Sequence, residues 1–325
     1  QGGVLSNNKG INRKGGGLTA PALTDKDMQD IKTAAKLKAD YLAVSFPRSG
    51  ADMEWARKLM LKAGGRSLLC AKIERAEAIP ALAEIVEASD SIMVARGDLA
   101  VEVGDAVVPA LQKRMIRMAR ERNKLVITAT QMMESMINNP IPTRAEVSDV
   151  ANAVLDGTDA VMLSAETATG EYPVDAVGAM DRIIREMERQ GPGREERRRA
   201  EPRQGVSVED AIAQGTAAVA RMLGTPLIVT LTQGGFTART VATVRPPVPI
   251  LAVTTVPLTY RQLALVWGVE PVLVDRVPGY DAMLEVVRDL ILKRGYAKPG
   301  DRIVMTAGVP WEVSGGTNLI KVEEV

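Results

Sequence analysis

Short apolar runs rich in β-branched residues recur along the first half of the chain, separated by segments long enough for a helix and its loops. The runs are Tyr41–Val44, Leu68–Ile73, Ser91–Val94, Leu125–Ile127 and Ala160–Leu163. Strands that alternate with helix-length segments predict a parallel sheet built from βαβ units. Helix start signals agree, because Thr24 with Asp27 and Thr143 with Glu146 have near capping-box spacing, and Pro142 precedes the second pair. The pattern therefore predicts an α/β fold.

Polar residues suited to catalysis follow each of these strands. They are Ser45, Lys72 with Glu74, Arg96 with Asp98, Thr128 with Thr130, and Ser164 with Glu166. Side chains at positions i and i+2 of a strand point to the same face, so we expect each pair to reach one side of the sheet. In a β/α barrel the active site lies at the carboxyl ends of the strands. The spacing predicts a pocket for a small, strongly anionic ligand.

The composition changes after the first half. Residues 189–205 contain glycines, prolines and a run of arginines with neighbouring glutamates, which is typical of a solvated linker. Nucleic-acid binding by this run is disfavoured because its positive charge is largely compensated. A second α/β domain is predicted over 206–325, with a helix near Ser207–Met222 and strands near Leu227–Leu231, Ile250–Val253, Pro271–Val274 and Arg302–Met305.

The first strand of this second domain runs into a glycine-bearing turn, with a helix expected from about Thr237. The turn comprises Thr230, Thr232, Gln233, Gly234 and Gly235. Amides at a helix N-terminus have no acceptor within the helix and therefore bind anions readily. A tight strand-to-helix turn without a ligand is the alternative interpretation.

Composition narrows the class of protein. The chain has 325 residues, 46% hydrophobic and 25% charged, which is enough for more than one core. Its net charge of +1 favours neither a nucleic-acid nor a membrane partner. No apolar run reaches the roughly 18 residues of a membrane span, so we expect a soluble, cytoplasmic protein. The single Cys70 excludes an internal disulfide, and its strand position favours a buried residue over a reactive thiol.

The chain contains no histidine, which excludes a Ser-His-Asp triad, a histidine-ligated zinc and a phosphohistidine intermediate. Walker A and G-x-G-x-x-G motifs are also absent. Glu74 and Asp98 then form the natural pair for a hard divalent metal, with Lys72 beside them to stabilise an oxyanion. A structural ion-pair network at the barrel rim is the alternative. Arg96 is expected either to contact substrate or to pair with Glu74 or Asp98.

Several segments together resemble pyruvate kinase in order and spacing. They are Ala71–Glu74, Met93–Leu99, Thr128–Met136, Pro142–Glu146 with Ser148–Ala153, and Met162–Thr167. The resemblance covers essentially the whole chain, is strongest from about 7 to 173, and is closest to the bacterial type that responds to sugar phosphate or AMP. It implies the C-terminal part of a TIM (β/α)8 barrel at 20–188, a linker at 189–205 and an α/β allosteric domain at 206–325.

The resemblance also implies roles for individual residues. Lys72 would contact the transferring phosphoryl group of phosphoenolpyruvate and stabilise the enolate, while Glu74 and Asp98 would hold Mg²⁺ or Mn²⁺. The amides of Gly97 and Asp98, with the Thr130 hydroxyl, would bind the substrate carboxylate. ADP would attack phosphorus, giving ATP and pyruvate without any need for histidine.

Further residues and partners follow from the same resemblance. Thr130 and Ser164 would deliver a proton to the enolate carbon. Arg96 and Glu166 would not contact the substrate but would help to position the residues that do. K⁺ and a homotetramer are expected for the parent enzyme. The effector, a sugar monophosphate or AMP, would bind two loops in the second domain, where Phe236 and Gly235 replace more polar family residues. These loops contain Thr230, Thr232, Gln233, Gly234, Gly235, Thr237, Gly315, Gly316 and Thr317.

Two departures from the family pattern stand out. Ala100 replaces a glycine, for which we expect a small packing adjustment. Residues 1–19 resemble the segment where family members return from a lid domain to the barrel, so five of eight barrel strands and an inactive fragment are expected. Two other functions stay open: a Mg²⁺-dependent barrel lyase acting on phosphoenolpyruvate or a keto acid, and a non-catalytic sugar-phosphate-binding module.

Overall fold

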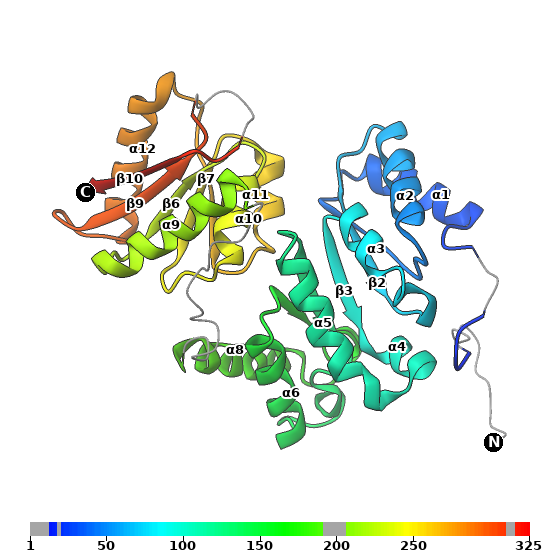
Figure 1. Ribbon diagram of the computed structural model, residues 1–325. Helices are drawn as coiled ribbons and strands as arrows, with labels where there is room; N and C mark the ends of the chain where they lie inside the picture. The colour runs from blue at the N-terminus through cyan, green and yellow to red at the C-terminus, as the bar shows by residue number, and fades with distance from the viewer. Residues whose placement is uncertain (1–12, 18–20, 191–205, 310–315) are drawn as a thin grey trace. The chain divides into compact units, whose positions relative to one another are not determined.

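The computed structural model describes residues 13–17, 21–190, 206–309 and 316–325. Contacts divide the chain into two compact units, residues 1–187 and 188–325, and each is described by itself (Figure 1). Most of the expected return segment 1–19 and of the expected linker 189–205 lies outside the described residues.

The first unit contains a five-stranded parallel sheet in the order β1-β2-β3-β4-β5. Each strand thus pairs with its neighbour in sequence, as successive βαβ units require. This confirms the predicted strands to within two residues at either end. The strands are β1 Tyr41–Val44, β2 Leu68–Ile73, β3 Ser91–Ala95, β4 Leu125–Ala129 and β5 Ala160–Met162.

Helices follow the strands in alternation. Both predicted capping boxes are confirmed, and a third is formed at the start of α2 by Ser49 with Asp52. Ala100 lies on α4, partly buried against the core. The α-helices are α1 Asp25–Lys36, α2 Gly50–Lys62, α3 Leu82–Ala88, α4 Arg96–Val103, α5 Val108–Arg120, α6 Arg144–Leu155, α7 Ala165–Ala168 and α8 Pro173–Gln190. Short 3-10 turns are η1 Ala76–Ala78, η2 Asp105–Val107 and η3 Glu134–Ile137.

The two faces of this sheet have different surroundings. Leu69, Ala71 and Ile73 pack with residues of α2, α3, α4 and α5 in the main core, and Figure 1 shows these helices beside the sheet. Cys70 belongs to a small separate cluster with Met93 and other residues on the opposite face. Alternation along β2 puts Lys72 on the same face as Cys70, so the lysine projects away from the helices.

The second unit is a five-stranded sheet in the order β10-β9-β6-β7-β8, with β10 antiparallel to β9 and the other pairings parallel. Its strands are β6 Ile228–Leu231, β7 Ile250–Thr254, β8 Val269–Leu273, β9 Arg302–Ala307 and β10 Leu319–Glu324. Its helices are α9 Val208–Leu223, α10 Phe236–Thr243, α11 Pro257–Leu263 and α12 Gly279–Arg294. Sequence analysis missed β10, because Lys321, Glu323 and Glu324 interrupt its apolar pattern.

One face of this second sheet packs against α12 through Val229, Leu251 and Val287. The opposite face carries hydroxyls as well as aliphatic groups, since Thr230 on β6 lies directly opposite Thr306 on β9 and both are fully buried. Within the described ranges, no helix has both the length and the apolar character needed to cross a membrane.

Candidate active site

The end of β2 presents an ion pair between the partly exposed Lys72 and the buried Glu74. Lys72 Nζ lies 2.6 Å from Glu74 Oε1, and it also donates to Ser45 Oγ at 3.1 Å. The other carboxylate oxygen, Glu74 Oε2, accepts the Phe46 amide at 2.9 Å. Glu74 is 1% exposed, so its carboxylate is almost fully shielded from solvent. Both carboxylate oxygens nevertheless have polar partners. Predicted neighbours Ser45, Lys72 and Glu74 are thus brought together.

Burial raises the pKa of Glu74, and the hydrogen bond and charge of Lys72 and the Phe46 amide oppose that rise. The negative charge of Asp98 also raises the pKa of Glu74, as a like charge at the end of the neighbouring strand does. A hard divalent cation would relieve this repulsion, so the donor set fits Mg²⁺ or Mn²⁺. No cluster of three or more possible acidic, cysteine or histidine ligands forms among the residues that the structure describes.

Asp98 and Gly97 lie in the first turn of α4, immediately after β3. The Gly97 amide donates to Thr130 Oγ1 at 2.8 Å, which links the ends of β3 and β4. Gly97 and Thr130 are thus neighbours, and Asp98 follows Gly97 in the same helical turn.

The expected direction of Arg96 is wrong. Arg96 begins α4, so the strand alternation that would align it with Asp98 no longer applies. Its guanidinium pairs with Asp149 of α6 at 2.7 Å and donates to the carbonyls of Ala129 and Thr130. Arg96 thus ties α4 to α6 and to the end of β4, rather than pairing with Glu74 or Asp98 as was considered.

The same correction applies to Thr128 and Thr130. Thr128 is fully buried and donates to Thr158 Oγ1 at 3.1 Å, whereas Thr130 lies beyond the end of β4 in a left-handed conformation with φ of 66°. Gln131 has φ of 53°, so two consecutive non-glycine residues are left-handed. Such residues cost roughly 1–3 kcal/mol each and persist where neighbouring contacts fix them. The turn gives Thr130 a direction that strand geometry does not predict.

Ser164 and Glu166 also lie beyond their strand, β5, and do not share a face. Ser164 is exposed, whereas Glu166 is 3% exposed and accepts the amides of Ser164 at 2.7 Å and Met133 at 3.2 Å. Glu166 therefore holds two backbone segments together. In the sheet order, β3 and β4 lie between Ser164 and Lys72.

Cys70 is buried, and burial raises the pKa of its thiol to about 11. The thiolate is accordingly scarce at neutral pH. This agrees with the interpretation of Cys70 as a packing residue.

Sequence reasoning missed two residues that this geometry uses. Phe46 supplies the amide to Glu74 from a left-handed position with φ of 56°. Asp149 receives Arg96 from 53 positions along the chain. Neither contact leaves a local spacing signal, because each depends on which elements become neighbours.

The glycine-bearing turn of the second unit is closed by hydroxyl contacts. Thr232 Oγ1 accepts the Gly235 amide at 3.0 Å, and Thr259 Oγ1 donates to the Gln233 carbonyl at 2.7 Å. Gly235 is left-handed with φ of 78°. The turn leads into α10, as expected, but no part of it carries the strong ion pairs found at the first sheet.

The second expected effector loop meets this turn at one point. Thr317 Oγ1 lies 2.7 Å from Thr237 Oγ1 on α10. Gly316 is among the described residues, whereas Gly315 lies outside them. Thr230 is fully buried within β6 and therefore lies beneath the turn rather than on its surface.

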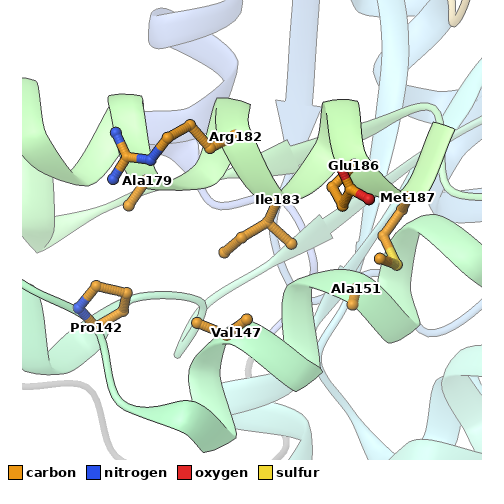
Figure 2. A pocket seen from close by; sticks show the side chains of 8 residues that line it. All are labelled: Pro142, Val147, Ala151, Ala179, Arg182, Ile183, Glu186 and Met187. Carbon is orange, nitrogen blue, oxygen red and sulfur yellow. The ribbon is translucent and has the colours of Figure 1, made fainter. Parts of the chain in front are cut away.

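An apolar hollow of about 300 Å³ separates α6 from α8 (Figure 2). It contains none of the expected catalytic residues. Its lining consists of Pro142, Val147, Ala151, Ala179, Arg182, Ile183, Glu186 and Met187. Figure 2 shows Val147 and Ala151 entering it from α6 and Ile183 from α8.

The chain is similar to known proteins along nearly its whole length. The family model "Pyruvate kinase, barrel domain" matches residues 1–177, and "Pyruvate kinase, alpha/beta domain" matches residues 210–323. Pyruvate kinase II of Salmonella typhimurium is 49% identical over 99% of this chain, which spans 68% of that protein. Pyruvate kinase of Buchnera aphidicola subsp. Baizongia pistaciae is 47% identical over the whole chain, and again 68% of the relative is covered. The chain belongs to the pyruvate kinase family.

Proposed function

We propose that this chain carries the catalytic residues of an enzyme that transfers the phosphoryl group of phosphoenolpyruvate to ADP, forming pyruvate and ATP in glycolysis. The observation that carries the proposal is the pairing of Lys72 with the buried Glu74, 2.6 Å apart at the carboxyl end of β2, where the charge of Asp98 also raises the pKa of Glu74. Phosphoryl transfer depends on fixed cations and a metal that absorb charge on the transferring group and the leaving oxygen. These residues provide that arrangement without histidine.

Glu74 and Asp98 would hold Mg²⁺ or Mn²⁺, which when bound supplies positive charge next to the substrate oxygens. Because Lys72 already contacts Glu74, the lysine lies at the edge of the same site. We expect K⁺ as an additional cofactor of the enzyme.

Lys72 would contact the phosphoryl group and then stabilise the enolate that remains after transfer. Its Nζ donates to Ser45 Oγ, which fixes its direction before substrate binds. A held ammonium group acts without the reorganisation that a mobile one would need. The partly exposed Lys72 thus combines access to substrate with a fixed position.

The substrate carboxylate would bind the amides of Gly97 and Asp98 and the Thr130 hydroxyl. Thr130 Oγ1 and Ser164 Oγ are our candidates for proton delivery to the enolate carbon, through water where the distance requires it. Arg96 and Glu166 would hold the backbone that carries these hydroxyls, which their contacts support.

The second unit would bind a sugar monophosphate or AMP at the turn formed by residues 232–237. Free amides at the start of α10 and the neighbouring hydroxyls suit a phosphate group. We also infer a cytoplasmic homo-oligomer, a tetramer by family, with no nucleic-acid or membrane partner. The lyase alternative is not favoured, because the family match at 210–323 is to the pyruvate kinase α/β domain.

The test is pyruvate formation from phosphoenolpyruvate and ADP with Mg²⁺ and K⁺. It is made on the chain itself and on a hybrid enzyme, in which this chain replaces the matching part of Salmonella pyruvate kinase II. Turnover by the hybrid supports the function. Absence of turnover by the isolated chain supports its expected inactivity. A folded hybrid with no turnover contradicts the function, and turnover by the mass-checked chain contradicts the expected inactivity.

A further inference from the structure

The segment directly after β4 has an unusual backbone. Thr130 and Gln131 both have positive φ, and Thr130 is β-branched, a residue type for which this conformation is a true outlier. We call residues 129–131 the Thr130 turn. A strained turn at the carboxyl end of a barrel strand needs contacts that hold it, and these contacts identify residues with a part in the site.

Arg96 supplies those contacts. Its Nε and Nη2 atoms donate to the carbonyl of Ala129 at 3.2 Å, that of Thr130 at 2.5 Å and that of Gln131 at 3.3 Å. The side chain is 9% exposed, and a planar guanidinium can satisfy several acceptors at once. One side chain therefore binds every carbonyl of the Thr130 turn.

Asp149 in turn holds Arg96. The remaining guanidinium nitrogen, Nη1, contacts both Asp149 oxygens, at 2.7 and 2.8 Å. Asp149 lies on α6. The first turn of that helix is itself fixed to the segment after β4, since Glu146 accepts the Ser135 amide at 2.7 Å. The helix is thus tied to the region after β4 at two places.

We propose that Asp149 is a positioning residue for catalysis. By orienting Arg96, it keeps the Thr130 turn left-handed and so keeps Thr130 Oγ1 at the Gly97 amide, where substrate carboxylate and enolate would lie. The inference rests on the proposed function for the role of Thr130, but the mechanical part, that Asp149 holds the turn, does not depend on it.

A purely structural ion pair is the competing explanation, and the chain contains a matched control for it. Asp156 follows the end of α6 and pairs with Lys113 and Gln112 of α5, with no contact to the Thr130 turn. Asp149→Asn and Asp156→Asn make the same chemical change in the middle of one helix and at its C-terminal cap. The Asp149 side chain is 36% exposed, so an amide can be accommodated without being buried unpaired.

The first measurement is amide hydrogen exchange on the full chain. In Asp149→Asn we expect exchange at the Gly97 amide, which donates to Thr130 Oγ1, to accelerate at least roughly tenfold, with amides in the middle of β3 and β4 unchanged. Asp156→Asn should leave the Gly97 amide at its original rate. Unchanged exchange at this amide in Asp149→Asn overturns the inference, whether or not the enzyme is active.

The second measurement is kinetic and uses the hybrid enzyme. Asp149→Asn should lower kcat roughly 10- to 100-fold, because a small displacement of a catalytic group is enough for such a loss. The KM for ADP should stay the same, and exchange of the pyruvate methyl protons with D₂O should slow in parallel with kcat. Asp156→Asn should leave all three quantities within about twofold.

Arg96→Lys gives an independent variant if Asp149→Asn does not fold. Lysine can keep the pair with Asp149 but cannot reach three carbonyls, so the turn should loosen while the ion pair survives. Faster exchange at Gly97 with normal kcat in either variant overturns the positioning role. A wild-type hybrid without turnover instead refutes the proposed function, and the exchange experiment still decides whether Asp149 holds the turn.

Discussion

The two sheets of this protein carry different chemistry where their strands end. In the first unit the ends of β2 and β3 carry ion pairs with one buried partner each, Glu74 with Lys72 and Arg96 with Asp149. In the second unit the end of β6 is followed by hydroxyls and backbone amides, seen where Thr232 accepts Gly235. Both sheets are largely parallel. In each unit one of these strands leads into a helix, β3 into α4 and β6 into α10.

The difference fits two kinds of anion binding. Buried charges that are already paired are costly to assemble, but they act strongly on a reacting group because little water screens them. Neutral amides and hydroxyls bind a phosphate group more weakly and release it readily. The first arrangement suits bond making and breaking, and the second suits a reversible effector.

The largest expected effect comes from removing the fixed cation of β2. Lys72→Met should lower kcat of the hybrid enzyme roughly 10²- to 10³-fold or more, because this cation is lost and Glu74 loses the positive partner that opposes the effect of its burial. Steady-state pyruvate formation measures this. Lys113→Met removes an exposed cation from another ion pair and should change kcat less than about twofold. A Lys72→Met enzyme with more than a tenth of normal activity contradicts the assignment.

A second test compares two threonines of one strand and its turn. Thr130→Val should lower kcat roughly 10²-fold, since it removes the hydroxyl next to Gly97 that we assign to proton delivery. Thr128→Val removes the buried bond to Thr158 instead, and should lower the free energy of unfolding by about 1–2 kcal/mol with normal kcat. Kinetics and chemical denaturation on both variants measure this pair, and equal kinetic effects would argue against a special role for Thr130.

A third test addresses the second unit through its glycines. In Gly235→Ala the new Cβ would lie 2.9 Å from Arg239 and 3.1 Å from Leu263, at a φ of 78° that alanine rarely adopts. We expect binding of a hexose monophosphate to the full chain to weaken roughly tenfold, which corresponds to about 1.4 kcal/mol. Gly234→Ala meets no atom within 4 Å and should bind normally. Calorimetry measures both, and equal affinities would count against the turn as the effector site.

The smallest expected effect concerns the contact between η3 and α6. Burial raises the pKa of Glu146, but bonds from the Ser135 hydroxyl and amide and from Thr143 outweigh it, so the net pKa is lowered from the usual 4.5. A lowered carboxyl pKa in the folded state means stabilisation that is complete above the usual pKa and lost as pH falls through the folded value. Ser135→Ala should therefore lower the free energy of unfolding by about 1 kcal/mol at pH 7 and by less at acidic pH.

Thermal unfolding at several pH values measures this difference. Ser89→Ala is the control, because Ser89 donates to the carbonyl of Ile85 rather than to a carboxylate. The loss of unfolding free energy in Ser89→Ala should not change with pH. A Ser135→Ala cost that is equally independent of pH would show that Glu146 does not titrate through this contact.

Much of the fold could be predicted because it follows from local patterns. The apolar runs of β1 and β2 and the capping boxes of α1 and α6 match the structure, since strand and cap formation depend on neighbours in sequence. The strand β10 was missed because an edge strand needs little apolar surface, so Lys321 and Glu323 can alternate with Val322 there.

Some features of the candidate site could likewise be predicted from the sequence, and others could not. The sequence by itself determined the family, the residue types at the strand ends and the pair Lys72 and Glu74, because these two lie two residues apart around the end of one strand. Tertiary structure decided the direction of Arg96 and the shape of the Thr130 turn. Both lie beyond the last strand residue, where strand periodicity ends and where contacts with a distant helix, through Asp149, set the backbone.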